Sequence, residues 1–459
     1  MKNDSFVRRS HVAAPAGDVF RWHTRPGAFE RLTPPWEAVE VLEPGDGVTD
    51  GSRVVVQTRI GPLQKRWIAE HFDYQDGRQF RDHQLEGPFA HWDHTHRCTP
   101  EGEGCLYEDQ VEYRLPAGAL GRAFGGALVR SRLERMFDYR HRIVAQDLKM
   151  HAENVAQKTL NVAVTGSGGL VGSALCPFLT TGGHRVLKLV RSVPDGESEV
   201  RWDPKGGNVD ADRLEGVDAV VHLAGENIAG ARWNDAQKER IRDSRVRGTR
   251  LLAESLAGLE RRPEVLVCAS AVGFYGDRGD EVLDEGSSAG RGFLADVCRE
   301  WEAAAEPARA AGIRVVHLRF GAILSPAGGA LAKMLLPFKL GAGGRLGSGR
   351  QYMSWIALDD VVGVAHRALV DTELSGPVNT VAPNPVTNAE FTRVLGRVLG
   401  RPTILPMPAF AARLAFGEMA DELLLASQRV RPGVLEDAGH GFQLPELEGA
   451  LRHLLGRRA

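Results

Sequence analysis

Residues 165–172 read Thr165-Gly166-Ser167-Gly168-Gly169-Leu170-Val171-Gly172, and this stretch decides the fold of the larger part of the chain. It follows an apolar run, Leu160 to Val164, and opens a segment with helical spacing, Leu170 to Leu179. Gly166 allows a tight turn, Gly169 lets the backbone approach a phosphate, and Gly172 lets helix and strand pack closely. The pattern predicts a phosphate-binding loop at a helix N-terminus, where free N–H groups face an anion.

The members of this loop that we expect to hold a dinucleotide are Gly166, Ser167, Gly169, Leu170, Val171 and Gly172. The alternative is a glycine-rich turn that binds no ligand. The surrounding sequence favours the first interpretation, because buried apolar runs alternate with helical segments, as in a parallel sheet covered on both faces. These runs are residues 160–164, 185–190, 219–223, 265–269 and 313–318. We therefore predict an α/β Rossmann domain with a doubly wound parallel sheet.

The end of the second apolar run indicates which cofactor binds. An acidic side chain there would accept a hydrogen bond from the ribose 2′-hydroxyl of NAD, whereas an arginine can pair with the 2′-phosphate of NADP. Arg191 follows Val190 directly, and the acidic residues Asp195 and Glu197 come only later. We expect NADP(H) as the cofactor; the alternative is that Arg191 is a solvated loop residue.

The first 150 residues have a different pattern. Strand-like runs separated by turn residues precede a long segment with helical spacing, Gly118 to Asn154. The runs are 6–12, 53–60, 66–74, 78–85, 90–98 and 105–115, with a helical patch after Pro15. This order resembles the START-like (SRPBCC) helix-grip fold, an α+β fold in which a curved sheet wraps a long helix. The resemblance implies a small apolar ligand, and the alternative is a packed domain without one.

A polar region, Lys149 to Thr159, separates the two patterns. We expect a helix-grip domain over residues 1–152, a Rossmann domain with a substrate lobe over 160–405, and a helical extension of the lobe over 406–459. An apolar segment in the last part, around Leu414 to Leu425, is interpreted as packing of the lobe rather than a membrane anchor.

Composition narrows the possible partners. The 459 residues carry 57 basic and 59 acidic side chains, a net charge of −2 that indicates neither nucleic-acid nor membrane binding. The five cysteines are scattered and form no CxxC pair, which argues against a disulfide framework or a structural zinc site. No apolar stretch is long enough to span a membrane, and the start, Met1 to Arg9, has no apolar core of a signal peptide. We therefore expect a cytoplasmic protein. The oligomeric state stays open.

Several ordered motifs follow the third apolar run: 222–228 (His-Leu-Ala-Gly-Glu-Asn-Ile), Arg232-Trp233, Ser244-Arg245, 270–276 (Ser-Ala-Val-Gly-Phe-Tyr-Gly), Trp301-Glu302, 318–321 (Leu-Arg-Phe-Gly), 349–352 and 355–360. Together they resemble the extended short-chain dehydrogenase/reductase superfamily, in its atypical epimerase-family (cell-division-inhibitor-like) branch, over about residues 160–456. The resemblance implies a Rossmann core with a small C-terminal lobe. It also implies that Ala224 and Gly225 border the cofactor and that Arg319 lies near the nicotinamide.

The catalytic signature of that superfamily is a Ser or Thr followed by Tyr-x-x-x-Lys, in which the Lys lowers the tyrosine pKa for proton exchange. In this sequence Leu294 and Cys298 stand at the Tyr and Lys positions, and Ala271 stands at the Ser position. Two functions therefore stay open. The chain is an NADP(H)-binding oxidoreductase or epimerase-like protein acting on an unidentified small molecule, or a non-catalytic NADP(H)-dependent binding or sensing protein.

Three side chains remain as candidates for catalysis. Glu226, next to Gly225, can act as an acid or base beside a nicotinamide if it is partly buried; the alternatives are a helix cap or a salt bridge with Arg232. Ser270 and Tyr275 flank the segment that ends the fourth apolar run, where Tyr275 is either a substitute proton donor or a packing residue. Cys298 has apolar neighbours on a predicted helix, and we expect it to be buried and inert.

Histidines cluster in the first domain at His91, His94 and His96, together with Asp93. Strand alternation puts His94 and His96 on one face and His91 and Asp93 on the other. At most two histidines could share a metal ion, and a third ligand would have to come from elsewhere. We therefore expect no metal, and interpret this strand as a polar and aromatic face that lines a cavity or meets solvent.

Overall fold

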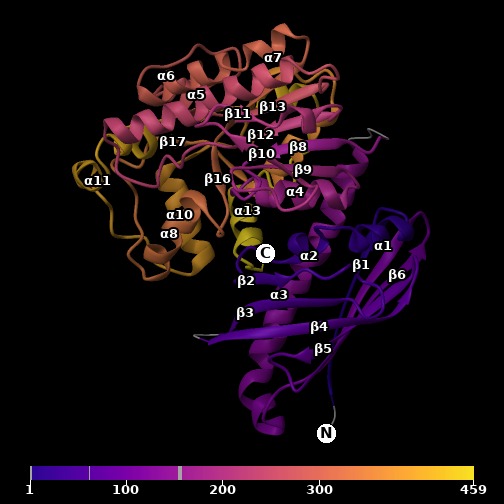
Figure 1. Cartoon of the computed structure of the whole chain (residues 1–459). Coiled ribbons are helices and arrows are strands. Elements are labelled where there is room, and N and C mark those ends of the chain that lie inside the picture. The colour runs from indigo at the N-terminus through magenta and orange to yellow at the C-terminus, as the bar shows by residue number, and fades with distance from the viewer. Residues whose placement is uncertain (1–2, 61–62, 154–157, 459) are drawn as a thin grey trace. The chain divides into compact units, whose positions relative to one another are not determined.

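The computed structural model describes residues 3–60, 63–153 and 158–458 (Figure 1). The chain divides into two compact units. The first comprises Met1–Val155 with the short pieces Thr180–Gly183 and His453–Arg458, and the second comprises Ala156–Leu179 and His184–Arg452. Each unit has its own sheet. The expected sequence of an α+β domain followed by an α/β domain is confirmed.

The first unit contains a seven-stranded antiparallel sheet in the order β1-β7-β6-β5-β4-β3-β2. Its strands are β1 (Asp4–Val12), β2 (Val39–Glu43), β3 (Arg53–Ile60), β4 (Leu63–Gln75), β5 (Gln79–Glu86), β6 (His91–Glu101) and β7 (Gly104–Arg114). Two short helices, α1 (Ala16–Thr24) and α2 (Ala28–Leu32), connect β1 to β2. The sequence indicated every strand except β2. That strand is short, and only one of its sides is partly buried, so it carries little apolar signal.

The long helix α3 (Gly118–Glu153) lies against this sheet, as the helix-grip fold requires (Figure 1). From Leu133 onward it supplies buried side chains to two clusters, including Leu133, Phe137 and Val144. The first half differs from the expected amphipathic pattern, because Leu120, Phe124 and Leu128 are 67%, 88% and 71% exposed. The expected end of this helix at Asn154 lies outside the described residues.

The second unit is built on an eight-stranded sheet in the order β11-β10-β9-β8-β12-β13-β15-β19. Its strands are β8 (Asn161–Thr165), β9 (Arg185–Val190), β10 (Glu199–Asp203), β11 (Asn208–Val209), β12 (Ala219–His222), β13 (Val265–Ala271), β15 (Arg314–Phe320) and β19 (Gly376–Thr380). All neighbours are parallel except β10 and β11. The order from β10 to β15 is that of a doubly wound Rossmann sheet, and the strand order reverses between β8 and β12.

The sheet of the second unit is covered on both faces. The larger buried cluster combines strand residues such as Val220 and Leu266 with Leu252 and Leu256 of α5 (Asp235–Ala257). Figure 1 shows α5, α6 (Phe293–Ala303) and α7 (Glu306–Ala310) on one side of the strands and α4 (Gly172–Thr181) on the other. Sequence analysis missed β10 and β19, in which polar or glycine residues interrupt the apolar run.

The remaining elements form the expected C-terminal lobe and small additions around it. They are β14 (Val282–Leu283), β16 (Ala322–Leu324), α8 (Gly329–Lys339), β17 (Tyr352–Met353), β18 (Trp355–Ala357), α9 (Leu358–Val370), β20 (Val386–Thr387), α10 (Asn388–Leu399), α11 (Ala409–Phe416), β21 (Arg429–Val430), α12 (Gly433–Asp437) and α13 (Leu447–Leu454). Short 3₁₀ or π turns span Ala211–Leu214, Val272–Tyr275 and Ala420–Leu425. Among the helices described, none combines the length and the apolar character that crossing a membrane requires.

Candidate functional site

The glycine loop lies where the strand order reverses, between the end of β8 and the start of α4. Gly166 has a φ of +71°, a left-handed conformation that glycine adopts without strain. The N–H of Gly169 donates to the Gly166 carbonyl at 2.9 Å, and the N–H of Ser173 donates to the Gly169 carbonyl at the same distance. The chain thus turns tightly and enters the helix where the first N–H groups of a helix can face an anion.

The spacing of the glycines is set by close backbone contacts. A Cβ at Gly172 would lie 2.3 Å from the Gly166 carbonyl oxygen, and a Cβ at Gly166 would lie 2.9 Å from the Ala224 nitrogen. A Cβ at Gly169 would be 3.2 Å from the Gly166 oxygen, whereas one at Gly168 would meet nothing within 4 Å. Gly166 and Gly172 therefore have the packing roles that the sequence indicated.

A buried hydrogen-bond pair holds this loop against the neighbouring strand. The Oγ1 atom of Thr165 and the Nδ1 atom of His222 lie 2.7 Å apart, and both side chains are fully buried. The same Oγ1 also accepts the N–H groups of Leu223 and Ala224 at 3.1 and 3.2 Å. Burial lowers the pKa of His222 to about 4, so its imidazole is neutral at physiological pH. This pair fixes the two strand ends around the reversal point.

The other predicted cofactor residues line the same edge of the sheet. Ser167, Leu170 and Val171 are half-buried in the turn before α4, and Gly225 is exposed at the end of β12. Arg191 is exposed and directly follows β9, at the carboxyl edge of the sheet. A side chain at that position can reach the adenosine ribose of a dinucleotide bound at the loop.

Ser270, Tyr275 and Arg319 meet in one buried network. Ser270 Oγ donates to Glu302 Oε1 at 2.7 Å, and the Arg319 guanidinium pairs with both oxygens of Glu302 at 2.8 Å. Arg319 Nη1 donates to the Tyr275 hydroxyl at 2.9 Å, and that hydroxyl donates to Asn379 Oδ1 at 2.7 Å. Burial disfavours the charged form of Glu302, but the bidentate pairing with Arg319 holds the pKa of this carboxyl below its usual range.

The polar groups of this network are engaged with one another. Tyr275 is fully buried, and Ser270 and Arg319 are only 2% and 3% exposed. The Arg319 guanidinium also lies 3.6 Å from the centre of the Phe274 ring. Arg319 therefore positions Tyr275 and Glu302, and its own side chain is held away from solvent.

Glu226 lies apart from this network, on the loop after β12. It is half-buried, its N–H donates to Ser244 Oγ at 2.9 Å, and its carbonyl accepts from Arg245 Nη1 at 3.1 Å. Within the described ranges its carboxylate has no hydrogen bond or ion pair, and Arg232 lies instead against Gly417. The carboxylate is therefore available to a bound molecule.

Arg245 on α5 belongs to one of the sequence motifs, Ser244-Arg245, but no role was predicted for it. A Cβ at Gly225 would lie 3.4 Å from its guanidinium carbon, and the guanidinium lies 5.0 Å from the Trp301 ring. Burial lowers the pKa of Arg245, while the nearby Cys298 and Glu226 work in the opposite direction. The guanidinium of Arg245 thus places a positive charge beside Gly225 and near Cys298.

Leu294 and Cys298, at the positions of the superfamily Tyr and Lys, are buried on α6. Burial raises the pKa of Cys298 to about 12, and the neighbouring Glu302 adds to the increase. Cys298 is buried, as the sequence predicted, and its surroundings therefore favour the protonated thiol at neutral pH.

The parallel sheet, its glycine loop at the reversal point and the bordering strand ends define a dinucleotide-binding α/β protein that follows a helix-grip domain. Family models match the chain in three places: NAD dependent epimerase/dehydratase family at residues 162–380, Polyketide cyclase / dehydrase and lipid transport at residues 12–137, and a domain of unknown function, DUF1731, at residues 407–454.

Relatives agree with these matches. An epimerase family protein of Mycobacterium tuberculosis is 49% identical over 296 residues, which is 64% of this chain and 98% of the relative. Human SDR39U1 is 36% identical over 300 residues, covering 64% of this chain and all of the human protein. The chain belongs to the NAD dependent epimerase/dehydratase family, in its SDR39U1-like branch, with an added N-terminal polyketide cyclase-type domain.

Two solved structures extend the comparison. A protein of Corynebacterium glutamicum described as a nucleoside-diphosphate sugar epimerase is 39% identical, with a TM-score of 0.82 over 98% of this chain and 90% of the other. The structure of human SDR39U1 (isoform 2) with NADPH is 33% identical, with a TM-score of 0.59 over 64% of this chain and 99% of the other. The resemblance drawn from the sequence is confirmed for both parts of the chain.

Proposed function

We propose that the second unit binds NADP(H) and acts as an oxidoreductase or epimerase-like protein on a small molecule. The observation that carries this proposal is the loop from Gly166 to Gly172, whose backbone contacts leave no room for side chains at either end. The same loop presents helix N–H groups at the reversal point of a doubly wound sheet, where such sheets bind dinucleotides. The structure of human SDR39U1 with NADPH supports the choice of cofactor.

The preference for NADP(H) over NAD(H) rests on Arg191. This side chain is exposed at the carboxyl end of β9. The strand ends in Val190 rather than in an acidic residue, so its end offers no carboxylate that could accept a hydrogen bond from a ribose 2′-hydroxyl. A guanidinium at this place pairs with a 2′-phosphate through charge-assisted hydrogen bonds. Gly225 and Ala224 border the same site from β12.

For proton transfer we propose Glu226 as the acid or base, because its half-buried carboxylate is free beside Gly225. Arg245 supplies the positive charge that the superfamily takes from its lysine, since Cys298 cannot carry one. Ser270 and Tyr275 act through their shared network with Glu302 and Arg319, which holds the end of β13 in place. Arg319 acts on the nicotinamide side by positioning rather than by direct contact.

A second candidate function is non-catalytic NADP(H)-dependent binding or sensing. The observation in its favour is the burial of Leu294 and Cys298 where proton transfer takes place in catalytic relatives. In this case the protein keeps the nucleotide loop and has lost turnover.

The first unit is proposed to bind a small apolar molecule, as the match to a polyketide cyclase and lipid transport family supports. The two units then bind different molecules, a nucleotide and an apolar ligand.

The decisive test is a binding and turnover experiment on the full chain. Calorimetry with NADPH and NADH measures cofactor preference, and NADPH oxidation against a panel of carbonyl compounds measures turnover. Tighter binding of NADPH with substrate-dependent oxidation supports the enzyme. Tight binding without turnover on any member, together with unchanged binding in Glu226→Gln, supports the sensing protein.

A matched pair of variants examines Arg245. Arg245→Lys keeps the charge and Arg245→Met removes it, while both keep a long aliphatic stem. If this charge faces the cofactor, the lysine variant retains most NADPH affinity and the methionine variant loses it. Equal losses would show that the guanidinium acts only by packing against Trp301.

A further inference from the structure

A cluster of charged and aromatic nitrogen groups lies in the middle of the first unit, on the strand that sequence analysis singled out. His94 and His96 on β6 are 3% and 7% exposed, and Asp109 on β7 is fully buried. Strand register places Asp82 of β5 directly opposite His94, and Asp109 directly opposite His96. All four side chains therefore lie on one face of the sheet, as the alternating burial of β6 also indicates.

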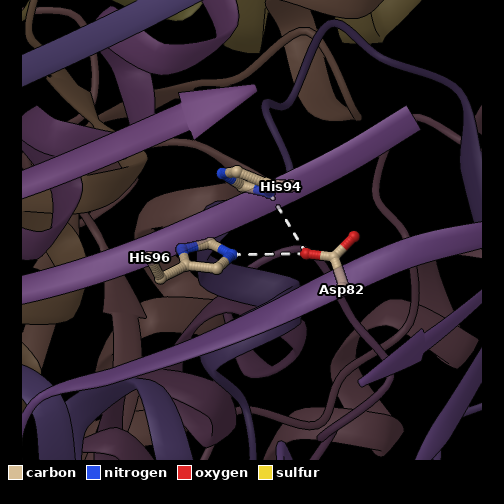
Figure 2. Close-up of side chains that lie close together, drawn as sticks. All are labelled: Asp82, His94 and His96. Atoms are coloured by element: carbon tan, nitrogen blue, oxygen red, sulfur yellow. Dashed lines mark ion pairs between the residues drawn. The ribbon is translucent and has the colours of Figure 1, made fainter. Parts of the chain in front are cut away.

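Three of these side chains converge on one point. Figure 2 shows His94 and His96 directed toward the carboxylate of Asp82 on the neighbouring strand. Asp82 Oδ2 lies 3.2 Å from His94 Nδ1 and 3.5 Å from His96 Nε2, and the three ligand atoms lie within 4.8 Å of one another. Ligand atoms at about 2.0–2.2 Å from a tetrahedral metal ion are roughly 3–3.5 Å apart, so the two distances from Asp82 to the histidines suit a common ion.

The opposite edge of each imidazole faces a second carboxylate. Asp109 Oδ1 lies 3.1 Å from His94 Nε2 and 2.7 Å from His96 Nδ1. Among the described residues His96 Nδ1 has no aligned hydrogen-bond partner, so its contact with Asp109 is an ion-pair distance only. Metal-bound histidines present their second nitrogen to a carboxylate in this way, which fixes the ring and makes the ligating nitrogen more basic.

Asp109 is itself held in place from the long helix. Its Oδ2 atom lies 3.0 Å from His141 Nε2, and His141 Nδ1 lies 2.7 Å from Ser10 Oγ. The cluster thus has an inner set of three side chains and an outer set that orients two of them. This layering matches that of metal sites.

Two carboxylates, Asp82 and Asp109, lie in the interior beside the two imidazoles. A buried carboxylate needs a cationic or hydrogen-bonding partner, and a divalent cation would supply one. The neighbouring rings of Phe80 and Phe137 pack against His96 and His94 and carry no charge. Asp82 is the most exposed of the three side chains, at 14%.

We propose that Asp82, His94 and His96 bind a divalent transition metal ion, with zinc(II) as the best match to two imidazoles and one carboxylate. Three protein ligands leave a coordination position for water or for an oxygen atom of a ligand in the first unit. Sequence reasoning expected no metal because it found only two ligands on this face. The third ligand, Asp82, comes from the adjacent strand.

The test uses the full chain after dialysis against EDTA, with cobalt(II) as the spectroscopic probe. We expect one equivalent of cobalt to bind, with the visible absorption of a four-coordinate ion, and zinc to displace it. The thermal unfolding temperature should rise when zinc is added. If neither stoichiometric cobalt binding nor a thermal shift occurs, the proposal is overturned and the cluster is an ion-pair network only.

Variants locate the ion. Asp82→Asn and His96→Gln should weaken cobalt binding by at least about 100-fold, whereas Asp109→Asn, which acts through the histidines, should weaken it by about 10- to 100-fold at unchanged stoichiometry. The matched controls are His91→Gln and His83→Gln, on the same strands but on the opposite face. Loss of binding in a control, with retention in Asp82→Asn, would place the ion on the surface and refute the site. The wild-type titration decides the question even if a variant does not fold.

Discussion

The guanidinium of Arg319 donates to the hydroxyl of Tyr275 over 2.9 Å, and both side chains are buried. Tyr275 also donates to Asn379 at 2.7 Å, so its single oxygen serves one donor and one acceptor. Burial raises the pKa of Tyr275 despite the adjacent guanidinium, so the hydroxyl keeps its proton at neutral pH. The tyrosine therefore connects the ends of β15 and β19 through its oxygen.

Removal of the Tyr275 hydroxyl should destabilise the folded protein. In Tyr275→Phe, Arg319 and Asn379 each lose a buried partner, and we expect the free energy of unfolding to fall by about 1–3 kcal/mol. Urea denaturation measures the loss. Tyr352→Phe, at a half-buried tyrosine, serves as the control and should change stability by less than about 0.5 kcal/mol. Equal stability of the two variants would contradict the role given to this hydroxyl.

The glycine loop offers a pair of matched substitutions. Gly172→Ala places a Cβ 2.3 Å from the Gly166 carbonyl oxygen, whereas Gly168→Ala meets nothing within 4 Å. We expect Gly172→Ala to weaken NADPH binding by more than about 10-fold, a loss above 1.4 kcal/mol. Gly168→Ala should stay within a few-fold of the wild type. Calorimetry of both variants provides the comparison, and similar affinities would mean that the loop does not bind the nucleotide.

Arg191 should determine the choice between the two nicotinamide cofactors. Arg191→Ala is expected to weaken NADPH by roughly 1.5–3 kcal/mol, the range for hydrogen bonds to charged groups, and to leave NADH little changed. Arg185→Ala is the control, because Arg185 is exposed at the opposite end of the same strand. Wild-type protein that binds NADH more tightly than NADPH would overturn the assignment.

His222 makes the nucleotide-binding unit sensitive to acid. Its pKa is about 4 in the folded protein against an ordinary value of 6.5, because burial disfavours the charged imidazole. Between these two values the unfolded chain binds a proton that the folded chain excludes. The contribution of His222 to the free energy of unfolding should therefore be fully present above pH 6.5, and it should be lost as the pH falls toward 4. A shift of this size corresponds to a loss of about 3 kcal/mol.

The variant that isolates this effect is His222→Asn, since an amide can still bond to Thr165 Oγ1 but does not titrate. We expect its stability to depend less on pH between 6.5 and 4 than that of the wild type. His11→Asn, at an exposed histidine, should leave the pH dependence as it is. Urea denaturation at several pH values gives the slopes, and identical slopes for wild type and His222→Asn would refute the assignment.

Both sheets were predictable because their strands carry strong local signals. The apolar run from Val265 to Ala269 is buried throughout and forms most of β13, and β3 matches its expected bounds of Arg53 to Ile60. The strand β10, Glu199–Asp203, was missed because it alternates polar and buried residues over only five positions. Phe124 was expected in an amphipathic pattern, yet it is exposed, since helical spacing does not reveal where the sheet ends along a helix.

In the candidate site, too, some residues could be predicted from the sequence and others could not. The glycine positions were readable because each backbone approach requires glycine, whichever fold surrounds it. The partners of Tyr275 were not readable, because Arg319 and Asn379 come from strands 44 and 104 residues further along the chain. Asp82 was missed for the same reason: only strand pairing brings it opposite His94.

Substitutions at Glu226 and Cys298 test which of the two residues transfers a proton. Cys298→Ala should keep NADPH binding and any turnover, because burial holds the thiol protonated with a pKa of about 12. Glu226→Gln keeps the shape of the side chain and should also keep binding, but it removes the carboxylate that we place beside Gly225. If Glu226 is the acid or base, turnover in this variant falls by about 100-fold or more.

Measurement of both variants on the same substrate separates the two residues. Parallel calorimetry with NADPH excludes a loss of cofactor as the cause of lower turnover. Glu239→Gln, at an exposed glutamate of α5, is the control for loss of a carboxylate and should turn over normally. Rapid stoichiometric labelling of Cys298 at neutral pH, with inactivation that substrate prevents, would instead make the thiol the reactive group. Its apolar environment argues against that result, because a thiolate at this position would be buried beside Glu302 and would bear the repulsion of that carboxylate.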